Sequence, residues 1–205
     1  MKAILISIHP QWVELILNLI KKDEIRKGSA LYKAINRLIE EQGVAPCLMY
    51  CTKDNKHDWY YCEELGCYFK DVLDHNRGWE YAKQLEPLNG KVIARYNATA
   101  EIINCWGDSI ANFSTKTLKE NELEMRSCLS YCDLFDYLAP SCSYEGYGDE
   151  VGTAVHIHDL QVFDKPKELS EFEHQVIYRN VYTDEKRYIR EPLRKAPQSW
   201  CYVEV

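Results

Sequence analysis

The chain has 205 residues, which is enough for one domain with a sizeable hydrophobic core. Hydrophobic residues make up 46% and charged residues 28% of the sequence, a mixture that excludes a mainly disordered chain or a fibrous repeat. The net charge of −7 argues against a protein that coats nucleic acid without selectivity. No apolar run reaches the roughly 18 residues of a membrane-spanning helix, and the N-terminus lacks a signal-peptide cleavage pattern. The sequence therefore predicts a cytoplasmic protein with no membrane partner.

The first fifty residues predict alternating strands and helices. Isoleucines at every second position predict a strand over Lys2–Ile8, and Pro10 opens an amphipathic helix. Residues 21–27, which are almost all charged, predict an exposed or edge strand. A second helix contains Leu31, Ile35, Leu38 and Ile39 and ends at Gly43 in the C-cap position. The apolar residues 47–52 predict a strand.

The remaining chain predicts further strands separated by two irregular regions. Residues 53–90 are polar but rich in aromatic side chains, and residues 91–104 predict one long strand or two bent ones. Two helices are expected over residues 115–139, the first with Ser114 or Thr115 as its N-cap. A strand over 152–163, a short helix over 168–172 and a terminal strand over 199–205 complete the chain.

Charge is distributed unevenly along the sequence. Residues 118–150 contain two basic and eight acidic side chains, whereas residues 179–195 contain six basic and three acidic ones. A local basic surface on an acidic protein suits selective binding of a short strand or a single nucleotide. A solvated charged loop explains the same pattern.

Cysteine and histidine residues raise the question of a metal site. The nine cysteines are odd in number and show no two-residue zinc-knuckle spacing, so reduced core cysteines are expected, with no metal. His156 and His158 project to one face of a strand, as a metal or acid–base pair or as hydrogen-bonded structural residues. No phosphate-binding loop or dinucleotide fingerprint occurs, so no cofactor is expected.

Several motifs follow one another in a recognisable order. Ser7–Ile8–His9–Pro10 and residues 13–17 precede KKDEIRK at residues 21–27. Residues 155–172 then place HIHDL before FDKP and LSEF, and the tail reads APQSWCYV. This combination resembles the ASCH domain, a branch of the PUA-like superfamily, in its bacterial and phage-borne forms.

The resemblance implies an α+β fold, a mostly antiparallel PUA-like β-barrel flanked by helices. Residues 1–205 would form a single domain, with 53–90 and 105–150 as helical insertions. In relatives, a cleft between barrel and helices accepts RNA, a modified base or a nucleoside. One branch hydrolyses N4-acetylcytidine with a lysine, a threonine and a glutamate. The lysine position falls on Lys21, but Glu24 replaces the threonine, so the hydroxyl of that branch is missing.

The strand over residues 21–27 has chemistry of its own. Alternation places Glu24 and Arg26 on one face and Lys21 on the other, unless the strand starts later or has a bulge. A lysine and an arginine beside a carboxylate can bind a phosphate or a base edge, and Lys21 with Glu24 can serve as acid and base. Cross-strand ion pairs on an edge strand are the structural alternative.

Three functions follow from these observations. The first is binding of RNA, single-stranded nucleic acid or a modified nucleobase by the cleft residues Lys21, Glu24, Arg26, Lys27, Thr52, Tyr144 and Tyr147, the tyrosines by stacking. The second is an amidohydrolase of a modified cytidine, with Lys21 and Glu24 as catalytic residues. The third is a phage or mobile-element protein whose insertions bind a protein partner.

Overall fold

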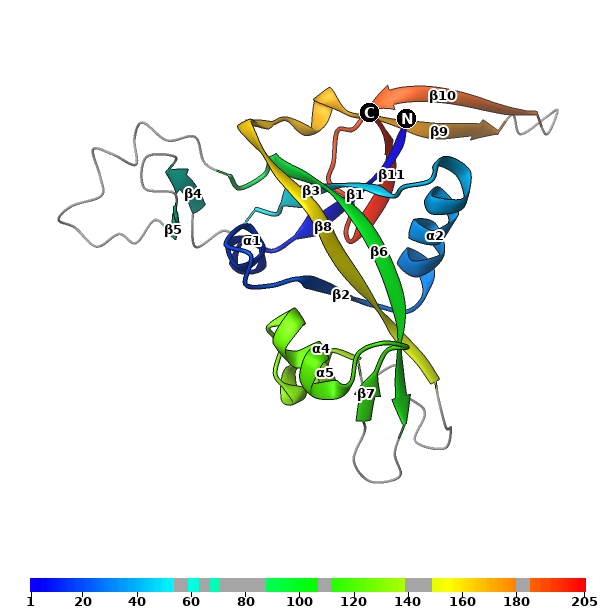
Figure 1. The fold of residues 1–205 in the computed structure, drawn as a ribbon. Helices are drawn as coiled ribbons and strands as arrows, with labels where there is room; N and C mark the ends of the chain where they lie inside the picture. The colour runs from blue at the N-terminus through cyan, green and yellow to red at the C-terminus, as the bar shows by residue number, and fades with distance from the viewer. Residues whose placement is uncertain (54–58, 63–66, 71–87, 107–111, 139–148, 180–184) are drawn as a thin grey trace. The chain divides into compact units, whose positions relative to one another are not determined.

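The computed structural model describes residues 1–53, 59–62, 67–70, 88–106, 112–138, 149–179 and 185–205. The described chain is an α+β protein, as the sequence predicts (Figure 1). Its helices are α1 (Pro10–Leu17), α2 (Ala30–Gln42), α4 (Glu120–Ser127), α5 (Tyr131–Leu138) and the 3₁₀ helix η2 (Leu169–Glu171). Its strands are β1 (Lys2–Ile8), β2 (Asp23–Lys27), β3 (Pro46–Cys51), β4 (Trp59–Cys62), β5 (Cys67–Lys70), β6 (Val92–Trp106), β7 (Asn112–Ser114), β8 (Asp149–Lys167), β9 (Glu173–Arg179), β10 (Lys186–Pro192) and β11 (Trp200–Glu204).

Nine of the described strands belong to one mostly antiparallel sheet. Its order is β10-β9-β11-β1-β3-β6-β8-β2, with β7 paired to β6, and β4 and β5 form a separate antiparallel pair. Strands β1 and β3 are parallel, which is possible because the connection between them is long and contains α1, β2 and α2. The described order has two ends, at β10 and β2, so closure into a PUA-like barrel stays a prediction.

The chain forms two compact units. Unit 1 comprises residues 1–14, 46–96 and 161–205, and unit 2 comprises residues 15–45 and 97–160. The prediction of a single domain with two insertions is not tested by this division.

Unit 1 has a core of its own, built from strands and from the segments that follow them. Alternate side chains of β1 and β3 meet the terminal strand β11, which pairs antiparallel with β1. The core residues are Ala3, Leu5, Leu48, Tyr50, Val92, Phe172, Leu193 and Val203.

Unit 2 packs two short helices against strands. The side chains of Leu123 on α4 and of Leu134 and Leu138 on α5 are fully buried. They meet apolar residues of β2, β6, β7 and β8, namely Ile25, Ile103, Cys105, Phe113, Val151 and Ala154. Strand β2 therefore contributes to the core of unit 2 through Ile25.

Most predicted elements are confirmed. Strand β1 has the predicted bounds, and Gly43 is the C-cap of α2 with a left-handed φ of 80°. The predicted strand over 91–104 is one long strand, β6, over Val92–Trp106. The predicted N-cap of the first helix in residues 115–139 is wrong. The Thr115 hydroxyl accepts the Leu118 amide at 2.9 Å in a separate turn, and α4 begins only at Glu120.

Five of the described strands, β4, β5, β7, β9 and β10, lie where the sequence predicted none. β4 and β5 form a pair within residues 53–90, which the sequence suggested to be irregular. β9 and β10 pair over seven positions in the basic region that follows η2. In the part of the chain that the structure describes, no helix has the length and apolar character needed to span a membrane.

Candidate functional site

Lys21, Glu24 and Arg26 form one cluster in unit 2. The Lys21 ammonium nitrogen lies 3.7 Å from Glu24 Oε2, and Arg26 Nη2 lies 3.0 Å from Glu24 Oε1. The Lys21 ammonium also donates a hydrogen bond to the carbonyl oxygen of Ser127. Ser127 is the last residue of α4, where the helix dipole favours a cation. The three predicted residues are therefore brought together, with Glu24 between two cations.

Lys21 reaches Glu24 because strand β2 starts late. The strand begins at Asp23, after a turn through Leu19, whose φ of 59° is left-handed. The Lys21 amide donates a hydrogen bond of 3.0 Å to the Leu15 carbonyl oxygen, which holds Lys21 outside the strand. The sequence left two arrangements open. In the structure the strand starts after Lys21, so the Lys21 side chain is not bound by strand alternation and reaches Glu24.

The prediction of an exposed or edge strand is confirmed in its second form, but most of the strand is buried. β2 is the edge strand at one end of the sheet order, but the side chains of Lys21 and Glu24 are only 2% and 7% exposed. A buried charge is tolerated when a partner and hydrogen bonds satisfy it. Here the partners are Arg26 for Glu24 and the Ser127 carbonyl of α4 for Lys21, and the local charge pattern does not show the second of these.

A second buried ion pair involves Asp23, which is fully buried. Arg126 donates two hydrogen bonds of 2.7 Å to its carboxylate, and His156 Nδ1 lies 2.9 Å from its Oδ1. Burial acts to raise the pKa of Asp23, but the hydrogen bonds and charges of His156 and Arg126 outweigh burial and lower that pKa below its ordinary value. The pair ties β2 to α4 and β8, which is a structural role.

Burial also changes the acidity of Lys21. Removal from water lowers the pKa of the Lys21 ammonium below its ordinary value, although the charge of Glu24 acts in the opposite direction. A lysine with a lowered pKa is more readily available as a neutral base, so this residue has one property of a catalytic lysine.

Lys27 and the two histidines of β8 have separate environments. The Lys27 ammonium lies 4.9 Å from the centre of the Tyr137 ring, in a cation–π contact. His156 is buried on Asp23, which confirms the hydrogen-bonded interpretation of this residue. His158 is exposed and lies 2.9 Å from the Thr99 hydroxyl. The two histidines therefore do not act as one pair.

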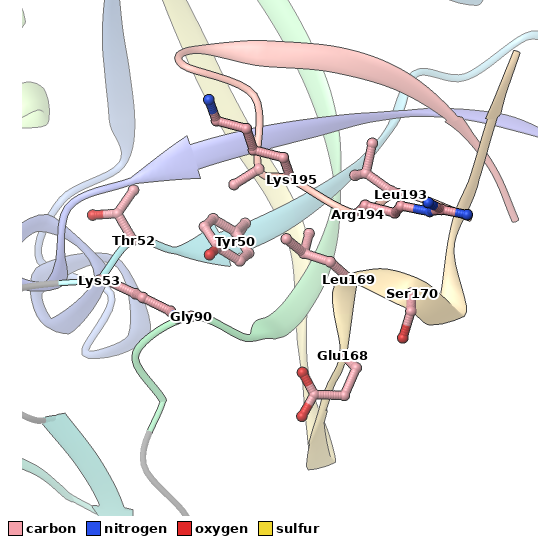
Figure 2. Close-up of a pocket in the computed structure, with 11 residues that line it drawn as sticks. Tyr50, Thr52, Lys53, Gly90, Glu168, Leu169, Ser170, Leu193, Arg194 and Lys195 are labelled. Atoms are coloured by element: carbon pink, nitrogen blue, oxygen red, sulfur yellow. The ribbon is translucent and has the colours of Figure 1, made fainter. Parts of the chain in front are cut away.

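Thr52 lies in unit 1, where it lines a cavity of about 650 Å³ (Figure 2). This volume is within the usual range of small-molecule sites. The wall combines the ends of β3 and β6 with η2 and the segment that follows β10. The lining residues are Tyr50, Thr52, Lys53, Gly90, Glu168, Leu169, Ser170, Leu193, Arg194, Lys195 and Ala196.

The lining is cationic at its exposed edge and apolar inside. Lys53, Arg194 and Lys195 are exposed. Glu168, the single carboxylate in the lining, is paired with the ammonium of Lys91. Figure 2 shows Tyr50 among the lining residues, with Glu168 and Lys195 on opposite sides of it. The cavity therefore has an excess of positive charge around an aromatic ring.

The hydroxyl groups of Thr52 and Tyr50 in the cavity lining have different environments. The Thr52 hydroxyl lies 3.3 Å from His9 Nδ1. Burial, with further contributions from Cys51 and the charge of Glu168, raises the pKa of Tyr50, so its hydroxyl stays protonated. Both groups can hydrogen-bond a polar ligand.

Sequence reasoning missed most of the cavity. The sequence predicts Thr52 as a ligand-binding residue. It also predicts a basic surface over residues 179–195, which include Arg194 and Lys195. Tyr50 was assigned only to an apolar strand, and no sequence signal linked Lys53 and Gly90 to η2. The predicted ligand residues Tyr144 and Tyr147 lie outside the described residues.

Three of the described cysteines fit the interpretation as core residues. Cys47, Cys51 and Cys105 are buried, and burial raises the pKa of Cys47, whereas Cys132 is exposed. A buried protonated thiol is a poor nucleophile. Across the described ranges, no group of three or more metal-ligating side chains comes together.

Neither a scan against models of known protein families nor a search of curated proteins finds a match to this chain.

Proposed function

We propose that this chain binds RNA, single-stranded nucleic acid or a modified nucleobase, and that the cavity of unit 1 holds one nucleotide. The observation that carries the proposal is the composition of that cavity, in which three cationic side chains surround a tyrosine and two aliphatic hydroxyls. A nucleotide has a complementary group for each of these: a phosphate for the cations, a flat base for the aromatic ring, and polar groups for the hydroxyls.

The cations account for the phosphate. Lys53 and Lys195 provide point charges, and the guanidinium of Arg194 offers a fork that fits a phosphate in bidentate fashion. Glu168 is the one acid in the lining, and its charge is offset by Lys91. An anionic ligand is therefore favoured over a cationic one.

The interior accounts for the base. Tyr50 is 5% exposed, so it forms part of the cavity floor, and Leu169 and Leu193 extend the apolar surface beside it. A base covering this surface leaves its polar edge within reach of the Thr52 hydroxyl. The resemblance to ASCH domains, whose relatives take RNA or a nucleoside, supports the same ligand class, and we extend the proposal to a PUA-like barrel.

The proposal is tested by calorimetry with the four ribonucleoside 5′-monophosphates, compared with the corresponding nucleosides. We expect the monophosphates to bind more tightly than the nucleosides, and the double substitution Lys53→Gln/Lys195→Gln to weaken binding by about tenfold, with a reduced salt dependence. Lys33→Gln on the exposed face of α2 is the control for the loss of a lysine. No binding of any nucleotide, or an equal loss in the control, contradicts the proposal.

A second candidate function is hydrolysis of a modified cytidine, and the buried Lys21–Glu24 pair favours it. Neutral Lys21 would take a proton from water as the oxygen attacks the acetyl carbon of N4-acetylcytidine. The carbon–nitrogen bond then breaks, the amine receives that proton, and acetate and cytidine leave. The lowered pKa of Lys21 fits the role of base.

Chromatography of N4-acetylcytidine incubated with the protein tests this alternative. We expect slow release of cytidine that is lost in Lys21→Met but kept in Lys22→Gln, since Lys22 is the exposed neighbour. Absence of product from the wild type rules the alternative out. The third function, binding of a protein partner through residues 53–90 and 105–150, stays a prediction, because much of both segments lies outside the described residues.

A further inference from the structure

The antiparallel pair β9–β10 in unit 1 has one face on which apolar and cationic side chains alternate. Residues directly opposite one another in an antiparallel pair share a face. Three consecutive pairs on the same face form the surface that we call the ribbon face. They are Arg179–Lys186, Ile177–Tyr188 and Gln175–Arg190.

The ribbon face is open to solvent. Ile177 and Tyr188 are 58% and 59% exposed, which is unusual for two large apolar side chains that lie directly opposite each other. Gln175 and Lys186 are exposed as well, and the Arg190 side chain is 65% exposed. An apolar pair left in water between polar rows indicates a contact surface.

The hairpin is anchored only at its base. In the described chain, β9 pairs with β11 at one position, Glu173 with Glu204, and with β10 at seven positions. Figure 1 shows both strands running well past β11. Both faces of the distal hairpin are consequently accessible to a ligand.

The ribbon face has the composition of a single-strand binding surface. Such surfaces combine cations for the phosphates with aromatic rings on which bases stack. Here Tyr188 supplies a ring, and cations lie on both sides of it. The rows Arg179–Lys186 and Gln175–Arg190 are four residues apart, which is about 13 Å along a strand, so they can contact phosphates on either side of a stacked base.

We propose that the ribbon face binds the backbone and one base of a single-stranded nucleic acid beyond the nucleotide held by the cavity. This inference rests on the proposed function and makes it more specific, since it names a polymer as the ligand. Charge favours this occupant, because the face has three cations. The carboxylates Glu173 and Glu204 lie at its base, where Glu204 Oε1 is 3.9 Å from Arg190 Nη2.

Fluorescence anisotropy with labelled 12-nucleotide RNA and DNA strands of mixed sequence, at two salt concentrations, tests the inference. We expect Tyr188→Ala to weaken binding about fivefold or more, as loss of one stacked base does. Lys186→Gln/Arg190→Gln should weaken binding. It should also reduce the slope of log K against log salt concentration by about 1.4 in magnitude, the value for two single-strand phosphate contacts. Arg187→Gln is the matched control, because Arg187 lies on the opposite face of the same strand.

The outcomes separate this inference from the proposed function. If the ribbon variants bind the 12-mer as the wild type does while mononucleotides still bind the cavity, the ribbon face is not the surface and the proposed function stands. If neither mononucleotide nor 12-mer binds the wild type, both fail. An equal loss in Arg187→Gln contradicts a face-specific contact. A wild-type dimer in size-exclusion chromatography that Tyr188→Ala converts to monomer would instead assign the face, beside the edge strand β10, to a second copy of the chain.

Discussion

Unit 1 and unit 2 use charged residues in opposite ways. In unit 2, Lys21 and Glu24 are almost fully buried and Asp23 is completely buried, and each has a charged partner. In unit 1, the cations of the cavity and of the ribbon face are exposed. Buried pairs are sensitive to loss of one member, whereas exposed charges contribute little to stability and are available to a ligand. The comparison separates charged residues that are buried in ion pairs from charged residues that are exposed and accessible to a ligand.

Asp23→Ala should have the largest effect on stability. The substitution leaves the guanidinium of Arg126 and the ring of His156 without their buried acceptor, and we expect the free energy of unfolding to fall by about 3 to 5 kcal/mol. Urea denaturation followed by circular dichroism measures this loss. Glu41→Ala, which removes an exposed ion pair on α2, should cost about 0.5 kcal/mol or less. Equal effects of the two substitutions would remove the contrast between buried and exposed charges.

Gly152→Ala should have the next largest effect. A Cβ at Gly152 would lie 2.9 Å from the carbonyl oxygen of Arg26 and 2.9 Å from Leu138 Cδ2, so backbone would have to shift. We expect a loss of about 1 to 3 kcal/mol in the same denaturation experiment.

Gly90→Ala, at the cavity of unit 1, is the comparison. There the added Cβ meets the flexible side chain of Lys53, and the cost should be about 1 to 2 kcal/mol, from the left-handed φ of 82°. A larger loss at Gly90 than at Gly152 would mean that the cavity wall is packed more tightly than the core of unit 2.

Acid should weaken unit 2 through Asp23. Because the folded-state pKa of Asp23 is lowered, its contribution to stability is present above the pKa of the unfolded chain, near 4, and is lost as the pH falls through the folded-state pKa. Thermal unfolding between pH 2 and pH 7 should therefore show a decline at acid pH that is shallower in Asp23→Asn. An unchanged acid limb in that variant would assign the decline to other carboxylates.

Glu168→Gln should have a small effect on stability and a measurable effect on binding. Its ion pair with Lys91 is exposed, so we expect a change in the free energy of unfolding below about 1 kcal/mol. Removal of the one carboxylate in the cavity lining should raise affinity for a nucleoside monophosphate a few-fold at low salt. Calorimetry measures this gain, and weaker binding would indicate that Glu168 contacts the ligand directly.

Local patterns in the sequence were sufficient for the regular elements. The isoleucines of β1, Pro10 at the start of α1 and Gly43 after α2 all act within a few residues, and the structure confirms each of them. Segments without such patterns were not predicted. The β9–β10 pair has mixed apolar and charged residues on both faces, so alternation gave no signal there.

The candidate site could be predicted only in part. The spacing of Lys21, Glu24 and Arg26 indicated that they act together, and they do form one cluster. Their burial was not predicted, because it depends on α4, which lies about a hundred residues further along the chain. Thr52 lines a cavity of unit 1 that does not include Lys21, Glu24 or Arg26, and its role as a ligand residue stays a prediction.

The sequence by itself determined the strands and helices with strong periodicity, and it contains the types of residue from which we propose nucleotide binding. Tertiary structure decided which of these charges are buried and which remain open to a ligand. The reason is physical. Neighbours in the sequence set the local conformation of a residue, whereas its desolvation and its ion pairs depend on residues that are distant in the sequence and come close only on folding. Arg126 at Asp23 and Glu168 at Lys91 are examples.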